Sequence, residues 1–328
     1  MTQVAILYLG RKYYPAEFPN KFSYEHNNIY RGLKSFCAKR DWWMHGLSLE
    51  EYNWLNSSVK DISFSNHFRR DASNLFFYVP TNTSLDIGLE ELLRIKNAGF
   101  VCYLWICDDQ WVEDNECRSI LDLCDYVCTT SRIAYEHLTS NGYICRPMLT
   151  QYAACSQELR KACRQPKMYD VSFVGQETHY RCKLVQSIRD AGFSCHTFGR
   201  GWAGKPKLPE DGAFGVYRKS RINLSLPNMY DEVVPRIKGR IFEIASVGGL
   251  VLTRYSEDIQ EYYEIEKEIW VFENFNECTQ KIKVLLSNPS VARRIASSMR
   301  LKTLLEHTWE SRFQDIFIDF IPSTSWKR

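Results

Sequence analysis

Residues 238–253, KGRIFEIASVGGLVLT, contain one complete change of secondary structure. Apolar residues at helical spacing predict a helix over residues 238–247, and the two glycines at 248–249 end it. The apolar run at 250–253 then predicts a buried strand. A helix that leads into a continuous apolar strand is the repeating unit of a parallel sheet covered on both faces. This stretch therefore predicts an α/β fold.

The same alternation extends along the rest of the chain. Predicted strands lie at 4–9, 75–79, 100–106, 126–128, 170–174, 194–198, 222–226 and 269–272. Predicted helices lie at 24–36, 87–97, 131–138, 180–191, 276–286, 289–305 and 308–320, with a short one ending at 217–220. A polar and basic stretch without a clear period interrupts the alternation at 151–168, and 328 residues suit two domains of about 150 each.

Composition excludes several classes of protein. With 45% hydrophobic and 25% charged residues, the chain is not disordered, collagen-like or a coiled coil. No apolar run is long enough for a transmembrane helix, and the first ten residues lack the pattern of a signal peptide. We therefore expect a soluble, cytoplasmic protein. The 12 cysteines are then expected to be buried free thiols rather than disulfides or zinc ligands.

Charge is unevenly distributed along the chain. Residues 1–160 carry a net charge of −3 and residues 161–328 a net charge of +6. The second half is therefore the better place for an anionic ligand. Residues 1–40 are a local exception, with seven basic and two acidic side chains. This cluster is either a solvated helix face or a surface that binds phosphates.

Three segments of the second half carry candidate chemistry. Residues 170–175, DVSFVG, are a strand that ends in a glycine turn before a helix bearing Arg181, a pattern that can bind an anion through backbone N–H groups. Residues 198–202, FGRGW, end a strand with glycines, and Trp202 is either a wall of a base pocket or a core residue. In residues 236–249 three cations precede Glu243. The G-x-G-x-x-G fingerprint is absent, which argues against a nicotinamide or flavin site.

Ordered motifs in residues 169–313 resemble the donor-binding domain of the CgeB-like glycosyltransferases, of the "glycosyl transferases group 1" type. The matching residues are Asp170, Phe173, Gly175, Arg181, Gly199, Gly201, Trp202, Tyr217, Ser220, Ile222, Leu224, Arg240, Phe242, Glu243, Gly248, Asn288, Pro289, Arg293 or Arg294, Ile295, Ala296, His307, Thr308, Trp309 and Arg312. More loosely, Ser23 with Glu25, and Trp105 with Asp108 and Asp109, are similar to elements of the first domain of such proteins.

The resemblance implies a GT-B fold, in which two Rossmann-like domains face each other across a cleft. It implies an acceptor-side domain over residues 1–150, a linker over 151–168, a donor domain over 169–306, and a final helix over 307–328 that returns toward the first domain. The expected activity is transfer of a sugar from a nucleoside diphosphate sugar, with UDP-sugar preferred, to an acceptor hydroxyl. The expected donor-binding residues are Gly175, Arg181, Gly199, Trp202, Lys238, Arg240, Glu243 and Gly248.

One departure from the family pattern concerns the donor sugar. Related retaining enzymes carry a second glutamate ahead of the one that matches Glu243, but Pro235 stands eight positions before Glu243. Glu243 then corresponds to the carboxylate that binds the ribose, and Asp231 or Glu232 could replace the missing one. Fixed cations are expected to stabilise the departing diphosphate without a metal or another cofactor. The resemblance implies that the configuration at the anomeric carbon is retained, whereas the residues themselves do not indicate the stereochemistry.

Acceptor activation is assigned to four candidates: Asp108, Asp109, Glu25 and His26, each of which could instead be a helix cap or a surface residue. Acidic pairs such as Asp108–Asp109 also suggest a metal, although this one lies in the acceptor half. The acceptor is a glycan or surface polysaccharide, or a hydroxylated base of phage-type DNA. A non-catalytic protein that binds nucleotide sugars is the alternative to an enzyme. The sequence does not identify an oligomeric state.

Overall fold

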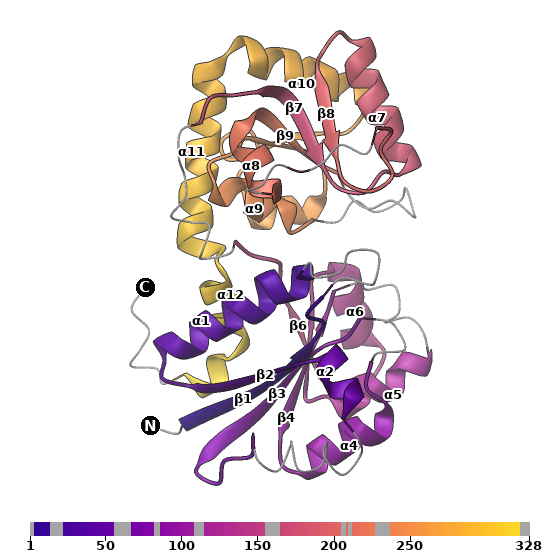
Figure 1. Ribbon diagram of the computed structural model, residues 1–328, viewed down its shortest axis with the longest axis vertical. Helices are drawn as coiled ribbons and strands as arrows, with labels where there is room; N and C mark the ends of the chain where they lie inside the picture. Colours follow the sequence, from indigo (N-terminus) through magenta and orange to yellow (C-terminus); the bar gives the residue numbers. More distant parts are fainter. Residues whose placement is uncertain are drawn as a thin grey trace. The chain divides into compact units, whose positions relative to one another are not determined.

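The computed structural model describes residues 3–13, 22–55, 67–81, 86–107, 115–154, 165–204, 208, 212–226 and 237–321. The chain divides into two compact units (Figure 1). The first unit contains Met1–Gln151 and Trp309–Arg328, and the second contains Tyr152–Thr308. The end of the chain therefore belongs to the same unit as its beginning.

The first unit is built on a six-stranded parallel sheet in the order β2-β1-β3-β4-β5-β6. Its strands are β1 (Gln3–Gly10), β2 (Trp43–Ser48), β3 (Ala72–Val79), β4 (Val101–Ile106), β5 (Tyr126–Thr129) and β6 (Arg146–Leu149). The sequence pattern did not predict edge strand β2, because its side chains are mostly half-buried and lack a continuous apolar run. It pairs with β1 in the register Ala5↔Trp43 to Gly10↔Ser48.

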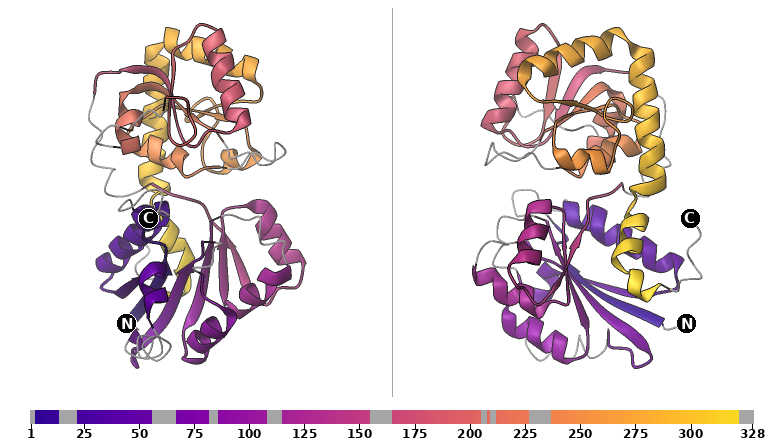
Figure 2. Two further views of the ribbon diagram at one scale, coloured as in Figure 1. Left: turned by 45° about the vertical axis from the view of Figure 1, so that its right-hand side comes forward. Right: turned by 180° about the vertical axis from the view of Figure 1, so that it is seen from behind.

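Helices cover both faces of this sheet. They are the π-helix η1 (His26–Tyr30), α1 (Arg31–Lys39), α2 (Leu49–Trp54), α4 (Leu89–Asn97), α5 (Asn115–Leu123), α6 (Arg132–Ser140), α12 (Trp309–Ile316) and the 3-10 helix η4 (Ile318–Phe320). Helices α2, α4 and α6 share one apolar core with Leu7, Phe76 and Leu104 of the sheet. Helices α1 and α12 lie side by side on the other face (Figures 1 and 2).

Close contact between α1 and α12 depends on a glycine. A Cβ atom at Gly32 would lie only 2.6 Å from the Cβ of Trp309, so a larger residue could not occupy this position without displacing α12. Beyond the glycine, the ring of Phe313 lies 5.8 Å from that of Phe36 and 6.0 Å from that of Phe77. Residues from opposite ends of the sequence thus form one aromatic core.

The second unit contains a five-stranded parallel sheet in the order β11-β10-β9-β7-β8. Its strands are β7 (Tyr169–Val174), β8 (Cys195–Phe198), β9 (Ser220–Ser225), β10 (Val251–Arg254) and β11 (Trp270–Phe272). Its helices are α7 (His179–Asp190), α8 (Gly212–Lys219), α9 (Arg240–Ser246), the 3-10 helix η3 (Glu257–Glu261), α10 (Phe275–Ser287) and α11 (Pro289–Glu306).

Two apolar cores hold this unit together, one on each face of its sheet. Helices α7 and α10 pack with Val171 and Phe173 in one core, and α8 and α9 pack with Val251 in the other. The parallel order of both sheets confirms the α/β fold that the sequence predicts. Among the described residues, none of the helices has the length and apolar character needed to cross a membrane. Nine cysteines within the described residues are free thiols.

Candidate functional site

The donor-site candidates lie mainly at the carboxyl ends of β7, β8 and β9, the edge at which open α/β sheets bind ligands. Gly175 follows β7 directly, Gly199 follows β8, and Arg240 begins helix α9. Three separate segments therefore bring candidate residues to one edge of one sheet. The contacts below show which of them meet and what each of them does there.

The backbone of Gly175 is fully engaged within the protein. Its N–H donates to the carbonyl of Phe198 over 2.8 Å, and its carbonyl accepts from the indole N–H of Trp202 over 2.9 Å. Gly199 approaches so closely that a Cβ atom there would lie 2.4 Å from the Gly175 oxygen, and its φ of +126° also favours glycine. The Gly175 N–H is therefore not among the backbone groups of this turn that could bind an anion, because it already has an acceptor.

Gly175 contributes to the site because it has no side chain and so leaves space for Arg240. A Cβ atom at this position would lie 2.7 Å from the Nη2 atom of Arg240 and 2.7 Å from the ring of Phe173. Since Phe173 is fully buried, only glycine lets the Arg240 guanidinium occupy its observed position. The absence of a side chain at Gly175 thus makes room for the Arg240 guanidinium.

Trp202 is a core residue. Its side chain is 5% exposed and meets the Phe173 ring edge-on, with centroids 6.0 Å apart. Of the two interpretations that the sequence left open, the structure favours packing over a wall of a base pocket. The indole contributes by holding the Gly175 carbonyl.

Arg181 is also buried, with 1% of its surface exposed. Its guanidinium donates to the carbonyls of Gln176 over 2.7 Å and Leu226 over 3.0 Å, and it lies 5.1 Å from the Phe173 ring centre. A guanidinium bound in this way fixes the loop after β7 to the end of β9. We therefore assign Arg181 a positioning role, in place of the direct contact with a diphosphate that the sequence suggested.

Arg240 is the more accessible of the two arginines. It lies on the same Phe173 ring, 4.9 Å from its centre, and Nη1 donates to the Leu226 carbonyl over 3.4 Å. The side chain is only partly buried, and Lys238, also partly exposed, precedes it by two residues. Arg240 and Lys238 are therefore two partly exposed cations at this edge, where the exposed Arg200 also follows β8.

Glu243 lies three residues after Arg240 on α9, a spacing that puts both side chains on one face of the helix. Both approach the hydroxyl of Tyr217, whose pKa is raised by burial and by the Glu243 carboxylate and lowered by the Arg240 guanidinium. A partly exposed carboxylate and a guanidinium are thus adjacent at the carboxyl edge. Tyr217 belongs to the family motif, but the sequence did not identify it as a neighbour of this pair.

Gly248 does not join the other candidates. It follows the end of α9, with a φ of +76°, and leads into the beginning of β10 at the amino edge of the sheet. A helix of seven residues is roughly 10 Å long, which separates Gly248 from Arg240. Gly248 instead lines a pocket with several arginines.

In the first unit, His26 lies within a row of stacked rings after β1. Its ring centre is 4.7 Å from that of Phe22 and 4.7 Å from that of Tyr30. Burial, followed by the charges of Arg31 and Lys12, lowers the pKa of His26 to about 4. The imidazole is therefore neutral at pH 7 and can accept a proton, although it is a weak base.

Glu25 immediately precedes the π-helix, a helix type that often marks functional sites. Its negative charge contributes to raising the pKa of Tyr8, which places the two residues close together.

Asp108 and Asp109 lie outside the described residues, as do Asp231, Glu232 and Pro235. In the described part of the chain, no group of three or more His, Cys, Asp or Glu side chains could hold a metal ion.

Comparison with known proteins supports the sequence resemblance. Residues 179–317, less than half of the chain, match the family model described as "Glycosyl transferase-like". The matched segment includes Arg240 and Glu243. No curated protein sequence matches this chain significantly. The match confirms the predicted resemblance to glycosyltransferases, and the narrower CgeB-like assignment stays a prediction.

Solved structures extend the likeness over the whole chain. Sucrose-phosphate synthase from Thermosynechococcus elongatus is 11% identical, with a TM-score of 0.60 over 97% of this chain and 98% of its own. The HepE protein of Anabaena, in complex with UDP and glucose, is 9% identical, with a TM-score of 0.59 over 97% of this chain and 99% of its own. The DNA-modifying enzyme β-glucosyltransferase is 12% identical, with a TM-score of 0.60 over 97% of this chain and 99% of its own. These likenesses confirm the predicted GT-B fold with two Rossmann-like domains.

Proposed function

We propose that this protein is a glycosyltransferase that moves a sugar from a UDP-sugar to an acceptor hydroxyl. The adjacent Arg240 and Glu243 at the carboxyl edge of the second sheet carry the proposal, together with the family match over that segment. Two proteins of the same fold support UDP as the nucleotide: HepE in complex with UDP and glucose, and β-glucosyltransferase with its substrate uridine diphosphoglucose.

Each of the accessible groups has a distinct task in the proposed donor complex. The Glu243 carboxylate accepts two hydrogen bonds from the ribose diol of the nucleotide. Arg240 and Lys238 hold the diphosphate, because a guanidinium and an ammonium provide charge-assisted hydrogen bonds to phosphate oxygens. Arg181 and Trp202 act indirectly. Arg181 holds the Leu226 carbonyl, to which Arg240 also donates, and Trp202 holds the backbone of Gly175, which leaves room for Arg240.

The proposed reaction breaks the bond between the anomeric carbon and the β-phosphate oxygen of the donor. The electron pair stays on that oxygen, and the acceptor oxygen forms the new bond to the anomeric carbon. Negative charge grows on the diphosphate as the bond breaks, so fixed cations lower the barrier most effectively there. In the proposed mechanism Arg240 and Lys238 perform this task without a metal ion.

The proton of the acceptor hydroxyl has two proposed destinations. In the retaining reaction that we propose, it passes to the departing phosphate oxygen, which lies on the same face of the sugar. In the second route it passes to a side chain of the first unit, Glu25, His26, Asp108 or Asp109. The low pKa of His26, about 4, makes it a poor general base at neutral pH and favours the phosphate route.

Binding and turnover of UDP-glucose test the proposal. We expect calorimetry to show weaker binding of UDP-glucose to Glu243→Gln, by about 1.5–3 kcal/mol for a lost charged hydrogen bond, or roughly 10- to 100-fold. Glu266→Gln is the matched control, since this exposed glutamate lies in the loop before β11 at the other edge. Equal binding to both variants and the native chain would refute the site.

Release of free UDP separates an enzyme from a non-catalytic binding protein. An enzyme hydrolyses the donor slowly without acceptor, and the rate falls in Arg240→Ala. Tight binding without turnover across a broad panel of acceptors would instead support the non-catalytic alternative.

Two acceptor classes are compatible with the first unit: a glycan, or a hydroxylated base in DNA. Lys12 lies 5.4 Å from the Tyr13 ring centre and Arg31 lies 5.4 Å from that of Phe22, so cations and rings alternate near the end of β1. A DNA acceptor requires binding that weakens steeply with salt, because phosphate contacts release counterions. A binding constant that is independent of salt, or no gel shift at low salt, would leave the glycan.

A further inference from the structure

A pocket lies at the amino edge of the second sheet, where its strands begin and opposite the edge that carries Arg240 and Glu243. Its cavity volume is about 780 Å³. The lead-in to β7, the junction of α8 with β9, the turn before β10, and helices α10 and α11 all contribute to its walls. It includes none of the donor-site candidates except Gly248, which the structure places here. The pocket is therefore separate from the proposed donor site.

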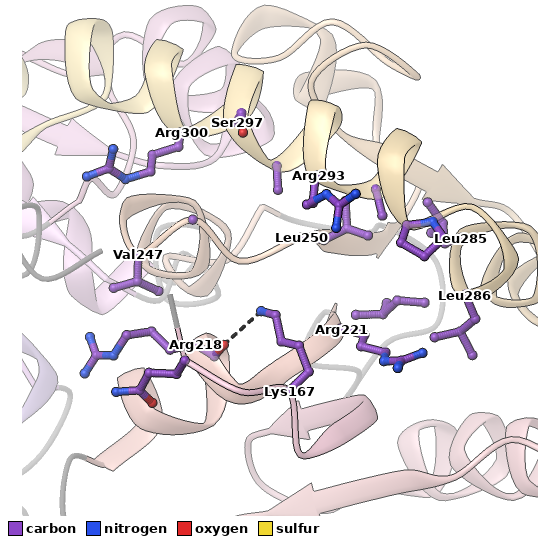
Figure 3. Close-up of a pocket in the computed structure, with 16 residues that line it drawn as sticks. Lys167, Arg218, Arg221, Val247, Leu250, Leu285, Leu286, Arg293, Ser297 and Arg300 are labelled. Atoms are coloured by element: carbon purple, nitrogen blue, oxygen red, sulfur yellow. Dashed lines mark hydrogen bonds between the residues drawn. The ribbon is translucent and has the colours of Figure 1, made fainter. Parts of the chain in front are cut away.

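Positive charge dominates the lining of this pocket. None of its lining residues is an aspartate or glutamate. Five cationic side chains from segments far apart in the sequence surround it: Lys167, Arg218, Arg221, Arg293 and Arg300. Figure 3 shows these side chains around one space, with Arg293 above it on α11 and Lys167 below it. Cations that face a shared cavity repel one another unless an anion lies between them.

Lys167 is the best-placed anchor for such an anion. Its ammonium donates to the carbonyl of Arg218 over 2.8 Å (Figure 3). It also donates to the carbonyl of Ser220 over 2.8 Å. Burial lowers the pKa of Lys167, which shows that the charged form is incompletely compensated. An ammonium has three N–H donors, and only two have acceptors among the described residues. The third is available to a ligand.

The arginines differ in how strongly the protein holds them. Arg300 donates through Nε to the carbonyl of Ser246 over 3.1 Å, and Arg221 pairs weakly with Asp170 at 3.5 Å. Arg293 is exposed and makes no hydrogen bond or ion pair with any residue that the structure describes. Its guanidinium, with five donors in a rigid fork, suits a phosphate or carboxylate group.

The remaining walls are apolar and suit an organic group beside the anion. Leu250, Leu285 and Leu286 line the part of the pocket near Arg293 (Figure 3). A volume of about 780 Å³ is within the range of pockets that hold small molecules. We propose that this pocket binds a small organic phosphate, with the phosphate between Lys167 and Arg293 and an apolar part against the leucines.

Calorimetric titration with phenyl phosphate tests this proposal, because the probe combines one phosphate with one apolar ring. We expect at least fivefold weaker binding to Arg293→Ala than to the native chain. Arg294→Ala is the matched control: it is the next residue of α11 and is also exposed, but it does not line the pocket. Both arginines are exposed, so neither substitution is expected to disturb folding.

Further arms of the titration identify the site and the ligand class. Glu243→Gln should bind phenyl phosphate like the native chain, since Glu243 acts at the other edge. Inorganic phosphate should bind more weakly than phenyl phosphate. Equal affinity for both probes would overturn the organic part of the proposal, and equal affinity of the native chain and Arg293→Ala would overturn the site.

A membrane source of the phosphate is separated by a sedimentation assay. Vesicles of phosphatidic acid and phosphatidylcholine present the same chemical group on a surface. If the protein binds these vesicles through Arg293 but does not bind phenyl phosphate in solution, the proposal of a small soluble ligand is overturned.

Discussion

Replacing Gly175 by alanine tests the central geometric claim about the candidate site, that this position exists to leave room for Arg240. The added Cβ atom would lie 2.7 Å from Arg240 Nη2 and 2.7 Å from the Phe173 ring. Ordinary contacts begin at about 3.4 Å, so the neighbours must yield by about 0.7 Å. Phe173 is fully buried in the core, whereas Arg240 is partly exposed and its end is held by a long hydrogen bond of 3.4 Å to Leu226. We therefore expect the guanidinium to be displaced.

The size of the effect follows from what the displaced guanidinium loses. A charged hydrogen bond is worth about 1.5–3 kcal/mol when one partner no longer reaches the other. UDP-glucose should then bind to Gly175→Ala roughly 10- to 100-fold more weakly. Overpacking should also lower the free energy of unfolding by about 1–3 kcal/mol.

Calorimetric titration of UDP-glucose, combined with thermal unfolding, measures both quantities. Gly88→Ala serves as the matched control, because a Cβ atom there meets no atom within 4 Å. The reasoning is refuted if Gly175→Ala unfolds cooperatively and binds UDP-glucose like the native chain. It is also refuted if Gly88→Ala weakens binding by the same factor.

Three further predictions concern packing and protonation. Gly32→Ala should destabilise the first unit by about 1–3 kcal/mol through its clash with Trp309, measured by urea unfolding, and an unchanged midpoint would contradict the tight helix contact. Trp202→Phe should cost about 0.5–1.5 kcal/mol by removing the hydrogen bond to Gly175 while retaining a ring, and a stability equal to that of the native chain would show that this bond contributes nothing. The pKa of His26, lowered to about 4 in the folded state, predicts that stability is lost as pH falls from about 6.5 toward 4, since the unfolded chain binds the proton more readily. His26→Phe should reduce this loss, and an unchanged pH profile would argue against it.

The alternation of helices and strands was predictable from the sequence because the spacing of apolar residues within each segment indicates its secondary structure. Continuous apolar runs such as residues 75–79 and 101–106 identify buried parallel strands without knowledge of their neighbours. Strand β2 escaped prediction because its half-buried side chains produce no such run. The position of Arg240 and Glu243 on one face of α9 was also predictable, because residues three apart in a helix lie on the same face.

Burial of individual polar side chains was not predictable in the same way. Arg181 has the sequence signature of an anion-binding residue, yet it donates to one carbonyl of the preceding loop and to one of a distant segment. Trp202 could equally have lined a pocket, and only the packing against Phe173 distinguishes the two cases. The five cations of the amino-edge pocket come from three separate segments of the sequence, so no spacing along the chain reveals them.

The placement of α12 in the first unit has a consequence for how the protein is made. The face of the first sheet that carries Phe77 and Tyr103 is covered by Phe313 and Phe317, which leave the ribosome only after the whole of Tyr152–Thr308. The first unit therefore still exposes aromatic surface when the residues of the second unit have already been synthesised. Shortening the chain before Trp309 would damage the unit that is translated first, and chaperone dependence during translation should be greatest for that unit.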